Sequence, residues 1–193
     1  MTEIIEILCR EHRNMEKLLR VLERELGIFE RGDRPDYDVL LGTIDYFKDY
    51  PDSCHHPKED LIFQKLKVRD PDKVASFGDL EAEHREGARR LSDVATVVHR
   101  VLNDEDLVRH AVSEIVRNFI ERERQHMVKE ERIAFPAALD VLQSADWADI
   151  ALRMADRYEP LAHPTQEAKY DLLQRNILEM EEEAEAQGAD RTR

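Results

Sequence analysis

The sequence predicts an all-α protein, an antiparallel up-down four-helix bundle with a short helical C-terminal appendage. Three observations support this fold class. Charged residues make up 37% of the 193 residues and aromatic residues only 6%, which favours helices with long solvated faces. Apolar residues recur at helical spacing, and no segment of useful length shows the alternation of a β-strand. Turn signals rich in acidic residues, glycine or proline separate the helical segments.

The first half of the chain is predicted to form two long helices. Helical spacing of apolar residues defines the first over 4–29, and a glycine and a proline in the turn 31–36 end it. The second covers about 37–67. Pro51 and Pro57 interrupt it, and each removes a backbone N–H and crowds the carbonyl four residues earlier. We therefore expect a kink or a break at these prolines.

The second half of the chain completes the bundle. A third helix is predicted over about 79–102. The acidic stretch 103–106 offers an N-cap and early acids for a fourth helix, which reaches Phe135 or beyond. Pro136 is expected to kink the end of that helix.

A C-terminal appendage is predicted to follow the bundle. Ser144 can cap a short helix, and a last helix is expected over roughly 166–185. The predicted domains are therefore a bundle over 1–143 and a helical extension with an acidic tail over 144–193. The extension can cover one side of the bundle or form a dimer surface, so a monomer and a homodimer both stay open.

Composition limits the partners and the compartment. The net charge of −14 repels phosphate backbones and anionic lipid, so neither nucleic acid nor a membrane is an expected partner. The N-terminus is acidic where a signal peptide is basic, and the two cysteines, Cys9 and Cys54, form no CxxC pair. These features predict a cytoplasmic protein whose cysteines act as small buried residues.

One motif occurs twice. SCHHPKEDLIF at 53–63 and QHMVKEERIAF at 125–135 both hold a histidine, a glutamate four residues later and a second acid directly after it. Residues four apart share one face of a helix, so each histidine and its glutamate project together. The second and fourth helices therefore carry the same pair of donor groups.

The predicted turns place four histidines at one height. In antiparallel helices, residues equidistant from the connecting turn lie level with each other. The midpoints between successive histidines fall inside the three turns. The histidines are His12, His55, His84 and His126, and the turns are 31–36, 69–72 and 103–106. The sequence therefore predicts that four imidazoles form one layer across the bundle.

This layer predicts a site for two divalent metal ions. Buried carboxylates without partners cost several kcal/mol each, so Glu59 and Glu130 need compensation. Two cations supply it if each takes two imidazole nitrogens and one oxygen from each bridging glutamate. Nitrogen and carboxylate donors without thiolate suit iron, manganese or zinc. Positions left open on each ion favour a functional centre over a structural one.

The order H…HxxxE…H…HxxxE resembles the hemerythrin-like HHE cation-binding family, over roughly residues 1–140. The resemblance implies a non-haem centre of two iron ions with a bridging oxo or hydroxo group, although manganese or zinc fits the donors too. It implies dioxygen, nitric oxide or peroxide as the small ligand. The implied terminal ligands are His12, His55, His84 and His126, and the implied bridges are Glu59 and Glu130.

The chain departs from the oxygen-carrying hemerythrins, which resemble it except that they have HxxxH in the third helix and HxxxxD in the fourth. Here Ala88 stands four residues after His84, and both Glu130 and Glu131 follow His126. The additional open position weakens simple oxygen carriage and favours sensing, nitric oxide handling or oxidative chemistry. Two alternatives stay open: an oxidase or peroxidase in iron or oxidative-stress handling, and a metal-stabilised helical interaction module.

Several further residues are assigned other roles. His56, Asp60 and Glu131 are expected outside the ligand set. Surface positions are expected for His99, His110 and His163, and Lys58 and Lys129 are expected to be solvated or to pair with neighbouring acids. Tyr46 is expected in the core.

Overall fold

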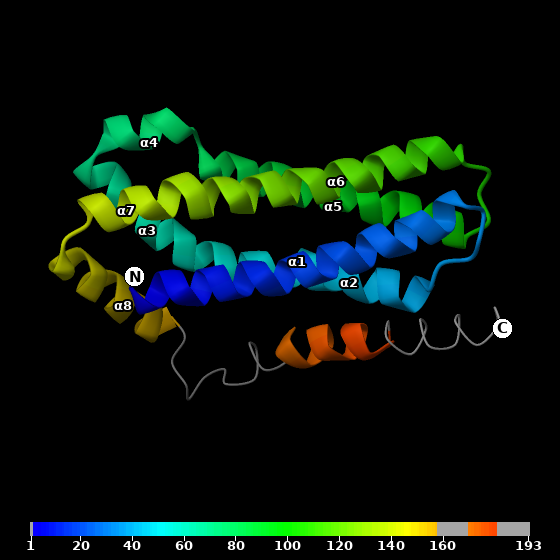
Figure 1. Cartoon of the computed structure of the whole chain (residues 1–193), viewed down its shortest axis with the longest axis horizontal. Helices are drawn as coiled ribbons and strands as arrows, with labels where there is room; N and C mark the ends of the chain where they lie inside the picture. The colour runs from blue at the N-terminus through cyan, green and yellow to red at the C-terminus, as the bar shows by residue number, and fades with distance from the viewer. Residues whose placement is uncertain (1, 158–169, 181–193) are drawn as a thin grey trace.

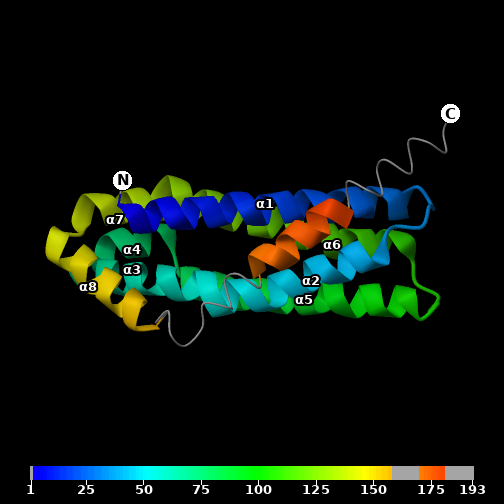
Figure 2. The same ribbon diagram turned by 90° about the horizontal axis from the view of Figure 1, so that it is seen from below.

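The computed structural model describes residues 2–157 and 170–180, and every regular element in these ranges is helical. Figures 1 and 2 show four long helical segments packed side by side in antiparallel order, which confirms the predicted fold class. The elements are α1 (Glu3–Glu30), α2 (Tyr37–Tyr50), η1 (Pro51–His55), α3 (His56–Arg69), α4 (Pro71–Phe77), α5 (Leu80–Leu102), α6 (Arg109–Lys129), η2 (Glu130–Ala134), α7 (Phe135–Val141), α8 (Ser144–Arg157) and a helix over 170–180.

The second long segment stays continuous through both prolines. Pro51 begins η1, a π-helical turn that ends at His55, and Pro57 lies in the first turn of α3. Inside a continuous helix, each proline removes one N–H from the backbone hydrogen-bond ladder, and the π-turn between the two prolines changes the ladder in this stretch. The expected irregularity is therefore a π-turn, and it falls next to a predicted ligand.

The fourth segment repeats this arrangement. The π-turn η2 begins at Glu130, and Pro136 lies in the first turn of α7. Both long segments that carry HxxxE thus contain a π-turn that includes one residue of that motif. Such turns re-aim side chains in a continuous helix, and they occur often at functional sites.

Two details of the sequence-based prediction were wrong. The acidic stretch 103–106 does not cap the fourth helix: α6 begins at Arg109, after an N-cap residue, Val108, that makes no side-chain hydrogen bond. The short helix α4 was not predicted. Asp70 caps α4 by accepting from the Lys73 N–H, and α4 already runs back along the bundle, so the chain reverses at the predicted turn (Figure 1).

The core has two apolar clusters, with the histidine layer between them. On α1, Leu8 belongs to one cluster and Met15 to the other, and His12 lies between them. The same order holds on α5, where His84 lies between Leu80 and Leu91. Polar groups in this layer are therefore shielded from water on both sides.

The appendage covers the bundle within the described residues. Ile150 of α8 is buried in the cluster that holds Leu8, and Asp146 accepts hydrogen bonds from Nε and Nη2 of Arg69 of α3. In the helix 170–180, Ile177 joins the other cluster, and the Gln174 side chain donates to a backbone carbonyl of α1. These contacts support the covering role. The bundle and extension boundaries and the choice between monomer and dimer stay predictions.

Candidate metal centre

The structure brings all six predicted ligands into one buried layer. His12 comes from α1, His55 from the end of η1 and Glu59 from α3. His84 comes from α5, His126 from α6 and Glu130 from η2. Both glutamates are completely buried. The convergence fits the predicted layer, and the role of these residues as ligands stays a prediction.

The first half of the centre is built on His12 and His55. Their Nε2 atoms lie 3.0 Å apart. Oε1 of Glu59 lies 3.1 Å from Nε2 of His55 and 3.5 Å from Nε2 of His12. Oε2 of Glu130 lies 3.4 Å from Nε2 of His12. Two imidazole nitrogens and one oxygen from each glutamate therefore surround one point.

The second half repeats this pattern with His84 and His126. Oε1 of Glu130 lies 3.1 Å from Nε2 of His126 and 3.5 Å from Nε2 of His84. The other oxygen of Glu59, Oε2, lies 3.5 Å from Nε2 of His84. Each glutamate thus turns one oxygen to each half, which is the arrangement of a bridging carboxylate.

The donor atoms fit a pair of metal ions. Donors about 2.1 Å from one ion and at right angles to each other lie about 3 Å apart, close to the spacing seen here. Both oxygens of Glu59 and of Glu130 are buried without a hydrogen-bond partner among the described residues, as are the Nε2 atoms of His84 and His126. Six buried polar atoms facing one small space are costly unless a cation compensates them.

Each half is backed by a glutamate–lysine pair that the sequence-based interpretation missed. His55 donates from Nδ1 to Glu11 at 2.7 Å, and Lys58 donates to the other oxygen of Glu11 at 2.5 Å. In the second half, His126 donates from Nδ1 to Glu83 at 3.0 Å, and Lys129 donates to the same carboxylate at 2.5 Å. Both lysines pair with an acid, which is one of the two alternatives expected for them, and Lys58 is also buried.

A repeat in the sequence singles out these two glutamates, although it does not identify their partners. Glu11 directly precedes His12, and Glu83 directly precedes His84, so a Glu-His pair occurs on both the first and the third helix. Each glutamate contacts the histidine of the neighbouring helix rather than its own neighbour in sequence. Because that contact crosses between helices, spacing along one helix does not reveal it.

The remaining two histidines also face carboxylates through Nδ1. Glu131 lies 3.0 Å from Nδ1 of His12, and Asp60 lies 3.9 Å from Nδ1 of His84. These are the second acids of the two HxxxE motifs, and both lie near Nδ1 of a histidine, on the side away from the centre. All four imidazoles therefore turn Nδ1 to a carboxylate and Nε2 to the centre.

The carboxylates hold protons on the imidazoles. Burial lowers the pKa of His126, but contacts with Glu130 and Glu83 outweigh it and raise that pKa to about 10. His12 follows the same pattern, since burial lowers its pKa, and its contacts with Glu130, Glu131 and Glu59 raise that pKa well above the usual value. Burial raises the pKa of Glu130, yet His126 and His12 hold it well below its ordinary range. A cation that binds here therefore replaces protons.

His56 lies against the second half. Its ring stacks on His84 with centroids 3.7 Å apart, and its Nδ1 donates to Asp52 at 2.9 Å. His56, Glu59 and His84 each offer a donor atom within 4.8 Å of the others. The six-residue set forms the more complete site, because two groups of two imidazoles and a glutamate cover it.

The other residues singled out from the sequence have ordinary positions. Tyr46 and Cys54 are buried in the core, and Cys9 is half-buried with its pKa raised by burial and by Glu131. His99 and His110 are exposed as expected. His163 lies outside the described residues.

Fold and donor groups together define a helical metal-binding protein. The model of one family, the hemerythrin HHE cation binding domain, matches residues 3–146. The chain belongs to this family. No match was found among curated proteins or among solved structures. Within the described residues, no helix has the length and apolar character needed to cross a lipid bilayer.

Proposed function

We propose that this chain holds two iron ions between His12, His55, His84, His126, Glu59 and Glu130, and binds dioxygen, nitric oxide or peroxide there. One observation carries the proposal: two buried glutamates each present one oxygen to each of two histidine pairs, and no hydrogen bond uses those oxygens. Iron supplies redox activity and coordination positions for a small ligand when it is bound. We also propose a cytoplasmic location, supported by two cysteines not joined in a disulfide.

The protein groups have separate tasks in this proposal. Glu11 and Glu83 hold the Nδ1 protons of His55 and His126, which directs the Nε2 lone pairs towards the centre. Phe135 stacks on the His12 ring with centroids 5.7 Å apart and limits access of water to the first half. These positions keep the donors in place before a small ligand arrives.

The small ligand is proposed to bind at the second half. Glu11 and Lys58, which back the first half, have side chains only 8% and 4% exposed. Glu83 and Lys129, which back the second half, are 39% and 26% exposed. His84 and His126 also line a pocket together with Ala88, and neither His12 nor His55 does.

The test is a titration of chelator-treated protein with ferrous iron under anaerobic conditions, followed by exposure to dioxygen or to nitric oxide. The proposal expects about two irons per chain and new near-ultraviolet absorption after either gas. Glu59→Gln should lose both effects, and Glu81→Gln, an exposed change on α5, should keep them. Iron binding that is equally strong in Glu59→Gln contradicts the assignment.

A second measurement separates ligand binding from turnover at the same centre. Dioxygen that is released unchanged under vacuum supports binding or sensing. Catalytic loss of peroxide supports an oxidase or peroxidase. Zinc bound in place of iron, with no spectral response to either gas, supports an interaction module.

A further inference from the structure

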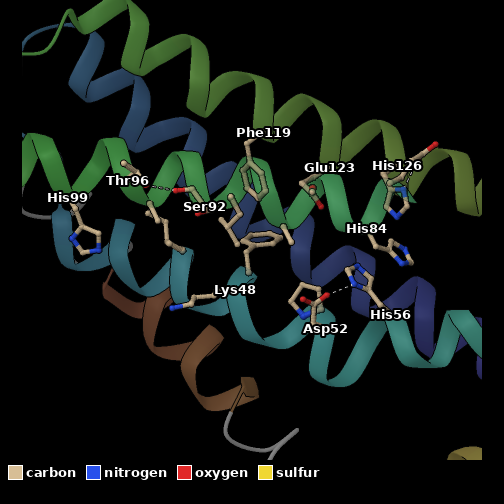
Figure 3. Close-up of a pocket in the computed structure, with 18 residues that line it drawn as sticks. Lys48, Asp52, His56, His84, Ser92, Thr96, His99, Phe119, Glu123 and His126 are labelled. Carbon is tan, nitrogen blue, oxygen red and sulfur yellow. Dashed lines mark hydrogen bonds and ion pairs between the residues drawn. The ribbon is translucent and has the colours of Figure 1, made fainter. Parts of the chain in front are cut away.

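A pocket of about 470 Å³ begins at the second half of the centre and follows the bundle away from it (Figure 3). His84 and His126 line one end, and Thr96 and His99 line the other. His84 and His99 are fifteen residues apart on α5, which corresponds to roughly 22 Å of helix. A diatomic ligand needs far less room, and the volume lies within the range of about 300–1,000 Å³ usual for small organic ligands.

The middle of the pocket is apolar. Its walls come from α2, α5 and α6, and they include Ile44, Phe47, Ala88, Leu91 and Phe119. Ala88 lies one turn beyond His84, where the pocket meets the centre. Because alanine has so short a side chain, this position keeps the pocket open towards His84.

Gly87 also keeps space at this end. A Cβ atom at position 87 would lie 2.8 Å from Oε1 of Glu123, so glycine lets this carboxylate of α6 lie against α5. Figure 3 shows Glu123 on the same side of the pocket as His126. The end next to the centre therefore holds a carboxylate that is close to α5.

Charge differs between the two ends. Asp52, Glu83 and Glu123 line the end next to the centre. Among the described residues that line the pocket, Lys48 is the only lysine or arginine. Its side chain is exposed and points towards the end that holds His99 (Figure 3). Two divalent ions would add four positive charges to this end. Eight carboxylates and two lysines lie around the centre, so its net charge stays negative with both ions bound, and Lys48 attracts an anionic group towards the other end.

We propose that this pocket binds a medium-chain carboxylic acid, with the carboxylate at Lys48 and the alkyl end beside His84 and His126. The apolar walls remove the chain from water, and the charges fix its direction. The proposal rests on the proposed function in one respect, because the alkyl end would lie beside the iron centre and make the small-ligand site apolar. Binding of the acid itself does not require the metal.

The first test measures binding of octanoate, dodecanoate and hexadecanoate to the full chain by isothermal titration calorimetry. The expected result is saturable binding with one molecule per chain and a preference for one chain length. Ala88→Phe and Lys48→Glu should each weaken binding by about tenfold or more. Lys17→Glu and Ala111→Phe change exposed positions outside the pocket and should leave it unchanged.

Two results overturn the proposal. One is the absence of saturable binding for all three acids in wild-type protein. The other is binding that neither Ala88→Phe nor Lys48→Glu weakens, with folding of both variants verified by circular dichroism. Lys48 is exposed, so its variant stays informative if the larger side chain at position 88 disturbs packing.

The direction of the bound acid has its own readout. In manganese-loaded protein, nuclear relaxation of the bound dodecanoate should be enhanced much more at the methyl end than at the carboxylate. Stronger enhancement at the carboxylate overturns the orientation. Acid binding by a chain that takes up no metal refutes the proposed function and leaves the pocket in place. Metal uptake without acid binding refutes the pocket alone.

Discussion

Oε2 of Glu11 lies 2.7 Å from Nδ1 of His55, and both side chains are almost completely buried. The hydrogen bond assigns the proton of the imidazole to Nδ1 and leaves Nε2 to face Glu59. His126 has the same relation to Glu83, at 3.0 Å. Two carboxylates outside the candidate ligand set therefore orient two of the imidazoles inside it.

The first prediction concerns these orienting carboxylates. We expect Glu11→Gln to weaken metal binding by about 10- to 100-fold, the usual effect of removing such a partner. Glu83→Gln should have a smaller effect, because Glu83 is 39% exposed and water can replace it. Competition with a chromophoric chelator measures both, with Glu81→Gln as the exposed control. Equal affinities in all three variants would contradict this role.

The second prediction concerns pH. The pKa of His126 is raised from 6.5 to about 10, and those of His12 and His55 are raised too. A raised pKa stabilises the fold fully below the unfolded value and loses this effect as pH rises through the folded one. The melting temperature of chelator-treated protein should therefore fall from about pH 6.5 to about pH 10.

The carboxylates set the acidic limit of this behaviour. Burial and Glu130 raise the pKa of Glu59, but His55 and His12 outweigh them and lower it. The stabilisation from Glu59 is present above about pH 4.5 and is lost as pH falls through its folded pKa. Added metal should raise the melting temperature more at higher pH, because protons leave when it binds. His126→Gln should flatten the alkaline decline, and an unchanged decline would refute the assignment.

The third prediction uses Gly87, in the interior of α5. Gly87→Ala should gain up to about 1 kcal/mol from helix propensity. Part of this gain is lost in wild-type protein, because the new Cβ lies 2.8 Å from Oε1 of Glu123 and displaces that carboxylate. Urea unfolding should show a larger gain in a Glu123→Ala background. The same gain in both backgrounds would mean that Glu123 does not lie against α5.

The fourth prediction tests which half receives the small ligand. Ala88→His places an imidazole one turn beyond His84, where the pocket meets the centre. We expect the iron content to stay unchanged and the affinity for nitric oxide to fall by about tenfold or more. Ala95→His, two turns further along the same pocket, is the matched control and should keep the affinity. A loss in both variants, or in neither, would place the ligand elsewhere.

Much of the fold was predictable because it rests on local patterns. Apolar spacing gave the long helices, and equal distances from the turns predicted that His12, His55, His84 and His126 lie at one height. The helix α4 was not predicted, but it runs back along the bundle, so the chain still reverses near Asp70 (Figure 1). His55 and His84 therefore still lie at one height. The start of α6 was missed because acidic residues suit an N-cap, while here they form the loop before Arg109.

The structure added what depends on contacts between helices. Glu11 and Glu83 became visible as partners only when their helices were placed against those of His55 and His126. The π-turns at His55 and Glu130 widen a continuous helix without any glycine, and the prolines beside them suggested only a general irregularity. The pocket beyond Ala88 depends on three helices at once.

The central claim is a centre of two iron ions bridged by Glu59 and Glu130. Its most direct test is to load the protein with iron, remove the excess, and measure how many irons each chain holds and whether they are magnetically coupled. Iron analysis with Mössbauer spectroscopy in an applied magnetic field should give two irons per chain that are magnetically coupled through bridging groups. Glu59→Ala and Glu130→Ala should each abolish the coupled signal. One iron per chain, or two uncoupled irons that persist in both variants, would contradict a centre bridged by Glu59 and Glu130.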